Sequence, residues 1–147
     1  MKVLELTESN FKGLGNIIEV DDKFCLASLD NFKYYLIDSM KSDGEITIGL
    51  LEVFKKVEGF GQLERHHLTE EVILPIKGNA LLHLAGHDKP SPLMEDILTF
   101  EIEPGTGVKL YKDVWHAIPA IESEELFLCL ILKAKTSEED NYFTEPH

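Results

Sequence analysis

The sequence has no long hydrophobic run, few basic residues and only two cysteines. Its longest purely apolar run, residues 126–132, has seven residues, whereas a membrane-spanning helix needs about 20. The start of the chain lacks the basic residues and the longer apolar stretch of a signal peptide. With 14 lysines and arginines against 27 aspartates and glutamates, the formal charge of −13 repels nucleic acids and anionic lipids. We therefore expect a cytoplasmic protein that binds neither membranes nor nucleic acids.

The two cysteines, Cys25 and Cys129, each stand alone in an apolar stretch, without the close spacing of a metal-binding pair. Single cysteines in apolar surroundings behave as small hydrophobic residues, and in the cytoplasm thiols stay reduced. We expect two free, buried thiols and no disulfide.

Segments with the hydrophobic periodicity of a helix are also scarce in the sequence. One short helix is predicted near the start, with Thr7 as its N-cap, Phe11 and Leu14 as its apolar stripe, and Gly15 after its end. Short strand-like runs follow, separated by turn residues, at residues 17–20, 25–29, 34–38, 45–53, 63–68, 72–76, 80–85, 97–103, 108–111, 114–118 and 126–134. This pattern predicts an all-β fold, an antiparallel barrel or sandwich. The chain has the length of one domain, residues 1–147, and its polar tail, residues 136–147, is expected to lie on the surface or fray.

The central stretch of the chain, from Gly61 to Gly78, carries the candidate chemistry. Glu64 and His66 are separated by one residue, so on a strand their side chains point to the same face. Glu71 follows five residues later on the next strand, and Gly78 closes the tight turn after it, where a side chain would clash. This spacing resembles the first sequence motif of the cupin proteins, although Glu64 stands where histidine is usual.

A second stretch, residues 107–119, is similar to the second cupin motif at His116. The resemblance implies a cupin-type double-stranded β-helix, a jelly-roll barrel in which the two motifs face each other. Glu64, His66, Glu71 and His116 would then converge. Two imidazoles and two carboxylates suit a divalent transition metal, with Ni, Mn, Zn and Fe all open as its identity.

Four places in the sequence resemble the ureidoglycolate lyase family. They are the opening segment 6–19, the central pair 63–66 and 74–78, the loop 88–90, and a closing motif formed by Gly107, Val108, Tyr111 and residues 114–116. His67 stands where proline is common in that family, and Glu71 where an amide is often found. The resemblance implies a homodimer that cleaves (S)-ureidoglycolate, a small anion, to glyoxylate and urea in allantoin degradation.

The substrate of that family carries a hydroxyl, a carboxylate and a ureido nitrogen on one carbon. Releasing urea requires a base for the hydroxyl proton and an acid for the leaving nitrogen, and a metal would acidify the hydroxyl. We expect His66 and His116 as metal ligands, with Glu64 and Glu71 completing the site. Glu71 is the candidate base if it is not a ligand, and His116 is expected to matter for catalysis. Lys77, which shares the strand parity of Glu71, could bind the substrate carboxylate.

Simpler interpretations stand beside each of these. The two histidines could be structural, the two glutamates solvated or salt-bridged, and Lys77 a surface turn residue. Arg65 and His67 alternate away from Glu64 and His66, so they are expected to point outward. We interpret His83 as a core or rim histidine, and Tyr111 and Trp115 as core aromatics that could also line a pocket mouth.

Two other functions remain open from the sequence. One is a cupin isomerase or oxygenase that acts on another small polar acid, a class whose first motif has two histidines. The other is a small-molecule-binding module without catalysis, in which Glu71 would be dispensable. Fold alone does not choose among them.

Overall fold

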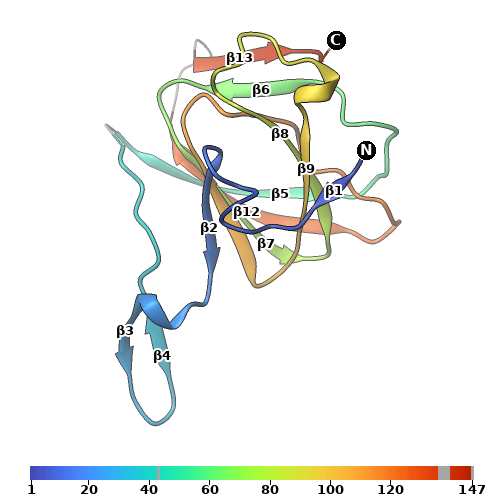
Figure 1. Cartoon of the computed structure of the whole chain (residues 1–147). Coiled ribbons are helices and arrows are strands. Elements are labelled where there is room, and N and C mark those ends of the chain that lie inside the picture. The colour runs from blue at the N-terminus through green and yellow to red at the C-terminus, as the bar shows by residue number, and fades with distance from the viewer. Residues whose placement is uncertain (43, 136–139, 147) are drawn as a thin grey trace.

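The computed structural model describes residues 1–42, 44–135 and 140–146, and it is built almost entirely from strands (Figure 1). The all-β prediction is confirmed, and no helix in the described parts of the chain is long and apolar enough to span a membrane. The strands are β1 (Val3–Leu4), β2 (Gly15–Glu19), β3 (Cys25–Ser28), β4 (Lys33–Tyr35), β5 (Ile46–Val53), β6 (Leu63–His66), β7 (Glu71–Lys77), β8 (Ala80–Ala85), β9 (Leu98–Ile102), β10 (Thr106–Leu110), β11 (Trp115–His116), β12 (Phe127–Ala134) and β13 (Asn141–Thr144). Two short 3₁₀ turns, η1 (Asp22–Phe24) and η2 (Met94–Asp96), interrupt them.

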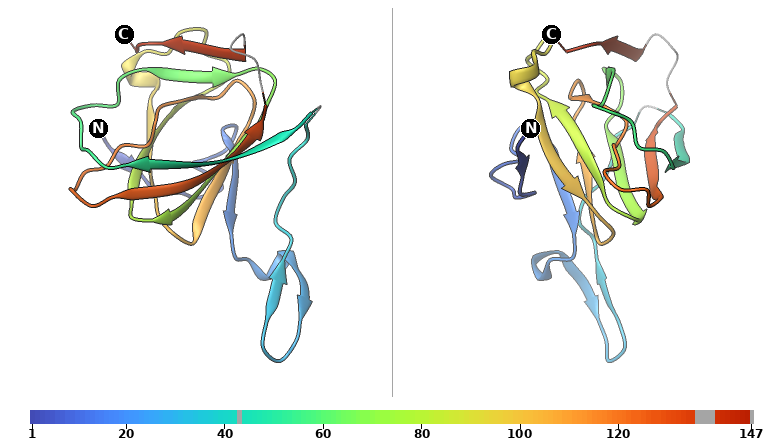
Figure 2. Two further views of the ribbon diagram at one scale, coloured as in Figure 1. Left: turned by 180° about the vertical axis from the view of Figure 1, so that it is seen from behind. Right: turned by 90° about the vertical axis from the view of Figure 1, so that its right-hand side faces the viewer.

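Two large sheets form the body of the molecule. One has six strands in the order β1-β9-β8-β11-β6-β13, and the other has five in the order β2-β10-β7-β12-β5. Their pairings are antiparallel except for that of β1 with β9. The sheets face each other across the core, as the views in Figure 2 show. This is the barrel of two sheets that the strand pattern predicts.

Strand alternation explains how the two sheets enclose a core. On β12, Phe127 and Cys129 are buried while Leu128 and Leu130 are partly exposed, so successive side chains face opposite sides of the sheet. Inward-facing residues of both sheets, together with two from the N-terminal segment and two from loops, form one cluster: Phe11, Leu14, Ile73, Ala80, Leu82, Leu84, Phe100, Ile102, Val108, Leu110, Val114, Ile121, Phe127 and Cys129.

The predicted N-terminal helix is wrong, because this segment forms only turns. Thr7 does cap the first of them: its hydroxyl accepts a hydrogen bond from the Asn10 N–H at 3.1 Å. Phe11 and Leu14 are buried, as expected of the apolar stripe. Gly13 then takes a left-handed conformation with φ of 81°, which ends the helical turns before a helix can propagate.

The C-terminal tail, which is expected to lie on the surface or fray, includes a strand. Part of it forms β13, which pairs with β6 and becomes the edge of the six-stranded sheet. The predicted tail also includes residues 136–139 and 147, which lie outside the described parts of the chain. Asp140, just before β13, is buried with 2% of its surface exposed. The tail therefore contributes a buried carboxylate to the barrel.

The hairpin of β3 and β4 projects from the barrel as an arm (Figures 1 and 2). The chain that returns from it is tied to the five-stranded sheet by Lys109. The Lys109 ammonium lies 3.0 Å from Asp38 and 3.4 Å from Glu70, and it donates to the Ser39 carbonyl at 2.9 Å. Burial lowers the pKa of Lys109, but the two carboxylates raise it by more, so the lysine stays charged.

Both cysteines are free, and Cys129 is buried while Cys25 is only partly so. Burial raises the pKa of the Cys129 thiol to about 11, so at pH 8 only about one molecule in a thousand carries the reactive thiolate. In native protein at pH 8 we expect an aromatic disulfide reagent to titrate one thiol, and to titrate two after unfolding. A Cys25→Ser variant should show none until it unfolds. Rapid reaction of two thiols in the native protein would contradict the assignment.

Candidate metal centre

The candidate residues come from three strands on both sides of the barrel. Glu64 and His66 lie on β6, and His116 on the neighbouring β11, where it pairs directly with Glu64. Glu71 begins β7 in the opposite sheet. The tight turn after β7 requires Gly78, whose φ is 76° and where a Cβ atom would lie 2.3 Å from the Leu126 carbonyl oxygen. The clash predicted at this glycine is therefore present.

The structure brings these four side chains together. One ligand atom from each of Glu64, His66 and His116 lies within 4.8 Å of the other two. The Oε2 atom of Glu71 lies 2.8 Å from His116 Nε2 and 3.6 Å from His66 Nε2. Glu64 Oε1 lies 3.5 Å from His116 Nε2. Carboxylate oxygens and imidazole nitrogens thus face one another between the two sheets.

Several of these facing atoms are buried and make no hydrogen bond. They are His66 Nε2, Glu71 Oε2 and His116 Nε2, on residues of which only 2%, 7% and 5% of the surface is exposed. A buried polar atom without a partner costs about 1–3 kcal/mol, and three such atoms pointing at one another need a common partner. A divalent cation would satisfy nitrogen and oxygen donors together. The residues present therefore fit a bound divalent metal.

The comparisons with known proteins agree with this geometry. A family model described as ureidoglycolate lyase matches residues 1–146. The chain belongs to the ureidoglycolate lyase family. Ureidoglycolate lyase 2 of Rhizobium meliloti is 25% identical over 156 residues, which cover all of this chain and 95% of that protein. A ureidoglycolate lyase of Pseudomonas putida is 23% identical, with 95% of this chain and 89% of the relative covered.

Two solved structures show the fold at low identity. WlaRA, a TDP-fucose-3,4-ketoisomerase from Campylobacter jejuni, gives a TM-score of 0.52 at 10% identity, covering 86% of this chain and 87% of that one. The 3,4-ketoisomerase QdtA from Thermoanaerobacterium thermosaccharolyticum also gives 0.52, at 15% identity, with 86% and 85% covered. These likenesses confirm the cupin-type barrel and say nothing about activity.

Electrostatics couple the carboxylates and imidazoles of this ureidoglycolate lyase family member. Burial lowers the pKa of His116, but the negative charge of Glu71 and the nearby Glu64 raise it to about 10. Burial raises the pKa of Glu71, and the two imidazoles more than reverse this, so that it falls well below its ordinary value. Contact with His116 lowers the pKa of Glu64 as well. Both carboxylates are therefore held ionised, and a positive charge between them, either the His116 imidazolium or a bound metal ion, is favoured.

A small cavity of about 170 Å³ adjoins this centre at Glu64. It is lined by Phe60, Gln62, Glu64, Ile118 and Phe143. Pockets for drug-sized ligands span roughly 300–1,000 Å³, so this one suits a smaller molecule. Glu64, whose side chain is 28% exposed, connects the cavity with the buried histidines.

The structure does not bring Lys77 to the site. Lys77 is exposed at the far end of β7, six residues from Glu71. Its expected parity fails because the pairing of β7 with β12 shifts register between Leu128 and Cys129, which lie opposite Lys77 and Pro75. A bulge of this kind turns the following side chains away from the regular alternation. Lys77 therefore does not join the candidate residues at the centre of this family member.

The neighbours expected to point outward do so. His67 contacts Asp113 and packs against Tyr142, with 39% of its side chain exposed. Arg65 stacks on Trp115, with its guanidinium carbon 4.4 Å from the ring centroid. The Trp115 Nε1–H donates to the Lys89 carbonyl at 2.7 Å, which ties the family's closing motif to its loop 88–90.

The expectations for His83 and Tyr111 have different outcomes. His83 is buried, hydrogen-bonded to the Thr99 hydroxyl at 2.9 Å and stacked on Phe60, as expected of a core histidine. Tyr111 is not a core residue, because 38% of it is exposed. Its hydroxyl donates to Asn16 Oδ1 at 2.7 Å, outside the barrel core.

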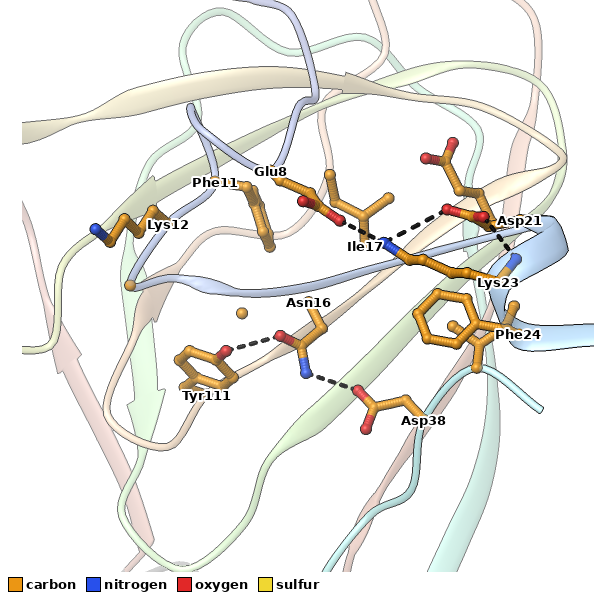
Figure 3. Close-up of a pocket in the computed structure, with 14 residues that line it drawn as sticks. Glu8, Phe11, Lys12, Asn16, Ile17, Asp21, Lys23, Phe24, Asp38 and Tyr111 are labelled. Carbon is orange, nitrogen blue, oxygen red and sulfur yellow. Dashed lines mark hydrogen bonds and ion pairs between the residues drawn. The ribbon is translucent and has the colours of Figure 1, made fainter.

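A larger cleft than this cavity lies elsewhere, between the N-terminal turns, β2 and the base of the arm (Figure 3). It measures about 430 Å³, but its central polar groups are paired with one another. Lys23 lies 3.0 Å from Glu8 and 3.5 Å from Asp21, and Asn16 donates to Asp38 at 2.8 Å. Figure 3 shows Lys23 reaching Glu8 and Asn16 reaching Asp38, and these two contacts join the base of the arm to the barrel.

One carboxylate beside the centre was missed by sequence reasoning. Asp140 Oδ2 lies 4.0 Å from His66 Nδ1. In the sequence this aspartate stands among other acidic residues of a polar tail, and nothing distinguishes it. The run of β-forming residues Tyr142, Phe143 and Thr144 was the one available signal for a strand here.

Proposed function

We propose that the protein is a ureidoglycolate lyase, which cleaves (S)-ureidoglycolate to glyoxylate and urea with a divalent metal at the site of Glu64, His66, Glu71 and His116. The convergence of two imidazoles and two carboxylates, with three buried donor atoms that lack hydrogen bonds, carries the proposal. Membership of the ureidoglycolate lyase family supports the substrate. The cavity beside Glu64 is of a size for so small an anion.

The reaction needs one proton to move within the substrate. The C–N bond to the ureido nitrogen breaks, the hydroxyl carbon becomes the aldehyde of glyoxylate, and the hydroxyl proton ends on the nitrogen of urea. A bound divalent metal would lower the pKa of the hydroxyl and offset the charge of the carboxylate. One protein group that takes and returns a proton completes the balance.

The geometry suggests a division of roles among the four residues. Glu64, His66 and His116 form the compact group, and catalytic metal sites commonly have three protein ligands with a further position open. Glu71 then stays free to accept the hydroxyl proton and return it to the leaving nitrogen. Its Oε2 atom lies 2.8 Å from His116 Nε2, which places its carboxylate beside the proposed metal position.

The deciding experiment combines metal analysis of the purified protein with an assay of glyoxylate release from (S)-ureidoglycolate. We expect about one divalent ion per chain and turnover that depends on it. Nickel, manganese, zinc and iron should be compared, because nitrogen and oxygen donors accept all four. Absence of turnover with every one of these metals would overturn the proposal and favour a binding module.

The cytoplasmic localisation expected from the sequence stays a prediction.

The homodimer is proposed on the exposed apolar surface. On the arm, Leu26, Leu29 and Phe32 are 65%, 67% and 47% exposed, and on edge strand β5, Ile48 and Leu50 are 79% and 67% exposed. An isolated two-stranded hairpin is at best marginally stable in water. Two copies related by a two-fold axis would cover this surface on both, since such an interface uses the same patch twice.

We expect light scattering after gel filtration to give a mass near twice 16.7 kDa. Placing a charge on the apolar edge with Ile48→Glu should shift the mass to that of one chain, because a buried unpaired carboxylate is costly. Lys55→Glu, which introduces the same residue at another exposed position, is the matched control and should stay dimeric. A monomer for the unmutated protein at micromolar concentration would refute the dimer.

A further inference from the structure

Asp140 is a fully buried carboxylate outside the four residues of the proposed centre. None of its side-chain surface is exposed. Its Oδ1 atom accepts a hydrogen bond from the Leu68 N–H at 2.7 Å, which fixes the direction of the carboxylate. Its Oδ2 atom makes no hydrogen bond and is directed toward His66 Nδ1, at 4.0 Å. That imidazole nitrogen is also buried and also without a hydrogen bond.

These two atoms suit each other. A buried carboxylate oxygen can only accept, and an imidazole Nδ1 can donate if it carries the proton. Each atom left alone costs free energy, and a shift of about 1 Å would bring them to ordinary hydrogen-bond distance. The other histidine of the centre already has this arrangement, because His116 Nδ1 lies 3.0 Å from the Val114 carbonyl oxygen.

A role limited to holding β13 in place does not account for a carboxylate here. The backbone of β13 pairs with β6 over four residues, with Tyr142 opposite Arg65 and Phe143 opposite Glu64. The Leu68 N–H would be satisfied equally well by a neutral side-chain amide. What remains to be explained is a buried carboxyl oxygen without a hydrogen bond beside a histidine, which proteins rarely leave unpaired.

We propose that Asp140 is a positioning residue that accepts the Nδ1–H of His66 and so presents the bare Nε2 of this histidine to the metal. The inference rests on the metal centre proposed above. A carboxylate behind a metal-binding histidine fixes its tautomer and its ring orientation, and loss of such a partner typically weakens metal binding 10- to 100-fold. The C-terminal segment thereby becomes part of the site.

The direct test is to determine the tautomer of His66 in the metal-free protein. Long-range proton–nitrogen spectra of histidine-labelled protein report which ring nitrogen carries the proton. The His66 signal is assigned by its loss in the His66→Gln variant. We expect the proton on Nδ1 in the unmutated chain and redistribution toward Nε2 in Asp140→Ala. In the Asp140→Asn variant the side-chain amide oxygen can still accept the hydrogen bond from the Leu68 N–H. This variant should therefore keep the fold even if Asp140→Ala does not. Glu145→Gln removes an exposed carboxylate from the same segment and should leave the spectrum unchanged.

The second readout is the affinity for Zn²⁺ and Mn²⁺ alone, measured by calorimetry. We expect 10- to 100-fold weaker binding in Asp140→Ala, about tenfold weaker binding in Asp140→Asn, and no change in Glu145→Gln. A proton on Nε2 of His66 in the unmutated protein, or equal affinity in Asp140→Asn and Glu145→Gln, would overturn the inference. If the unmutated protein bound no metal, the proposed centre would fail, whereas the tautomer would still report on Asp140.

Discussion

Replacing His116 by alanine is expected to lower kcat/KM for glyoxylate release by at least about a hundredfold. The His116 imidazole is buried and its Nε2 lies within 3.5 Å of Glu64 and 2.8 Å of Glu71. Without it the two carboxylates lose their central partner and a metal loses one of its nitrogen donors. The rate should be measured at saturating divalent metal, so that weak metal binding alone does not determine the result.

His67→Ala is the matched control for this prediction. His67 is the neighbour of His66, but strand alternation turns it outward, where it contacts Asp113 and Tyr142 instead of the centre. Its removal should change the rate by no more than about twofold and the free energy of unfolding by about 0.5 kcal/mol. Equal activity of the two variants would show that His116 has no role in the reaction.

The sequence was sufficient to predict which side chains share a face. Glu64 and His66 are separated by one residue, and a regular strand puts such residues on one side. The resemblance to cupins implies two motifs that face each other, whereas the short strand with His116, β11, pairs with β6 in the same sheet and brings His116 opposite Glu64. Local alternation together with a known topology therefore accounts for the placement of the four central residues.

The features that could not be predicted depend on contacts between distant segments. Lys77 leaves the expected face because of a register shift against β12, which begins some fifty residues later. The N-terminal helix is lost because Gly13 is left-handed and the chain joins the sheet at β2. Asp140 reaches His66 only because β13 pairs with β6. None of these follows from local propensity.

One residue of the centre, Glu71, differs from the residue type that the resemblance to the family leads us to expect. Glu71 stands where an amide is often found, and the structure places it among the buried atoms that face the two imidazoles. A carboxylate at this position adds a negative charge that an amide would lack, and this charge raises the pKa of His116. We therefore expect the proposed centre to attract a cation more strongly than an otherwise equal centre with an amide would.

Removing the metal is expected to abolish activity and to destabilise the fold together. A chelator that strips the centre should reduce glyoxylate release to background, because the substrate hydroxyl loses its activating cation. A metal present at about a thousand times its Kd stabilises the folded state by about 4 kcal/mol, which for a chain of this size corresponds to a fall in Tm of roughly 8–16 °C on chelation. Returning the divalent ion should restore the rate and the Tm in parallel.

The matched control is His116→Ala, whose Tm should respond far less to the chelator, since its centre has lost a donor. Full activity in protein that analysis shows to be free of metal would contradict the role of the ion, and an unchanged Tm would show that Glu64, His66 and His116 do not hold it.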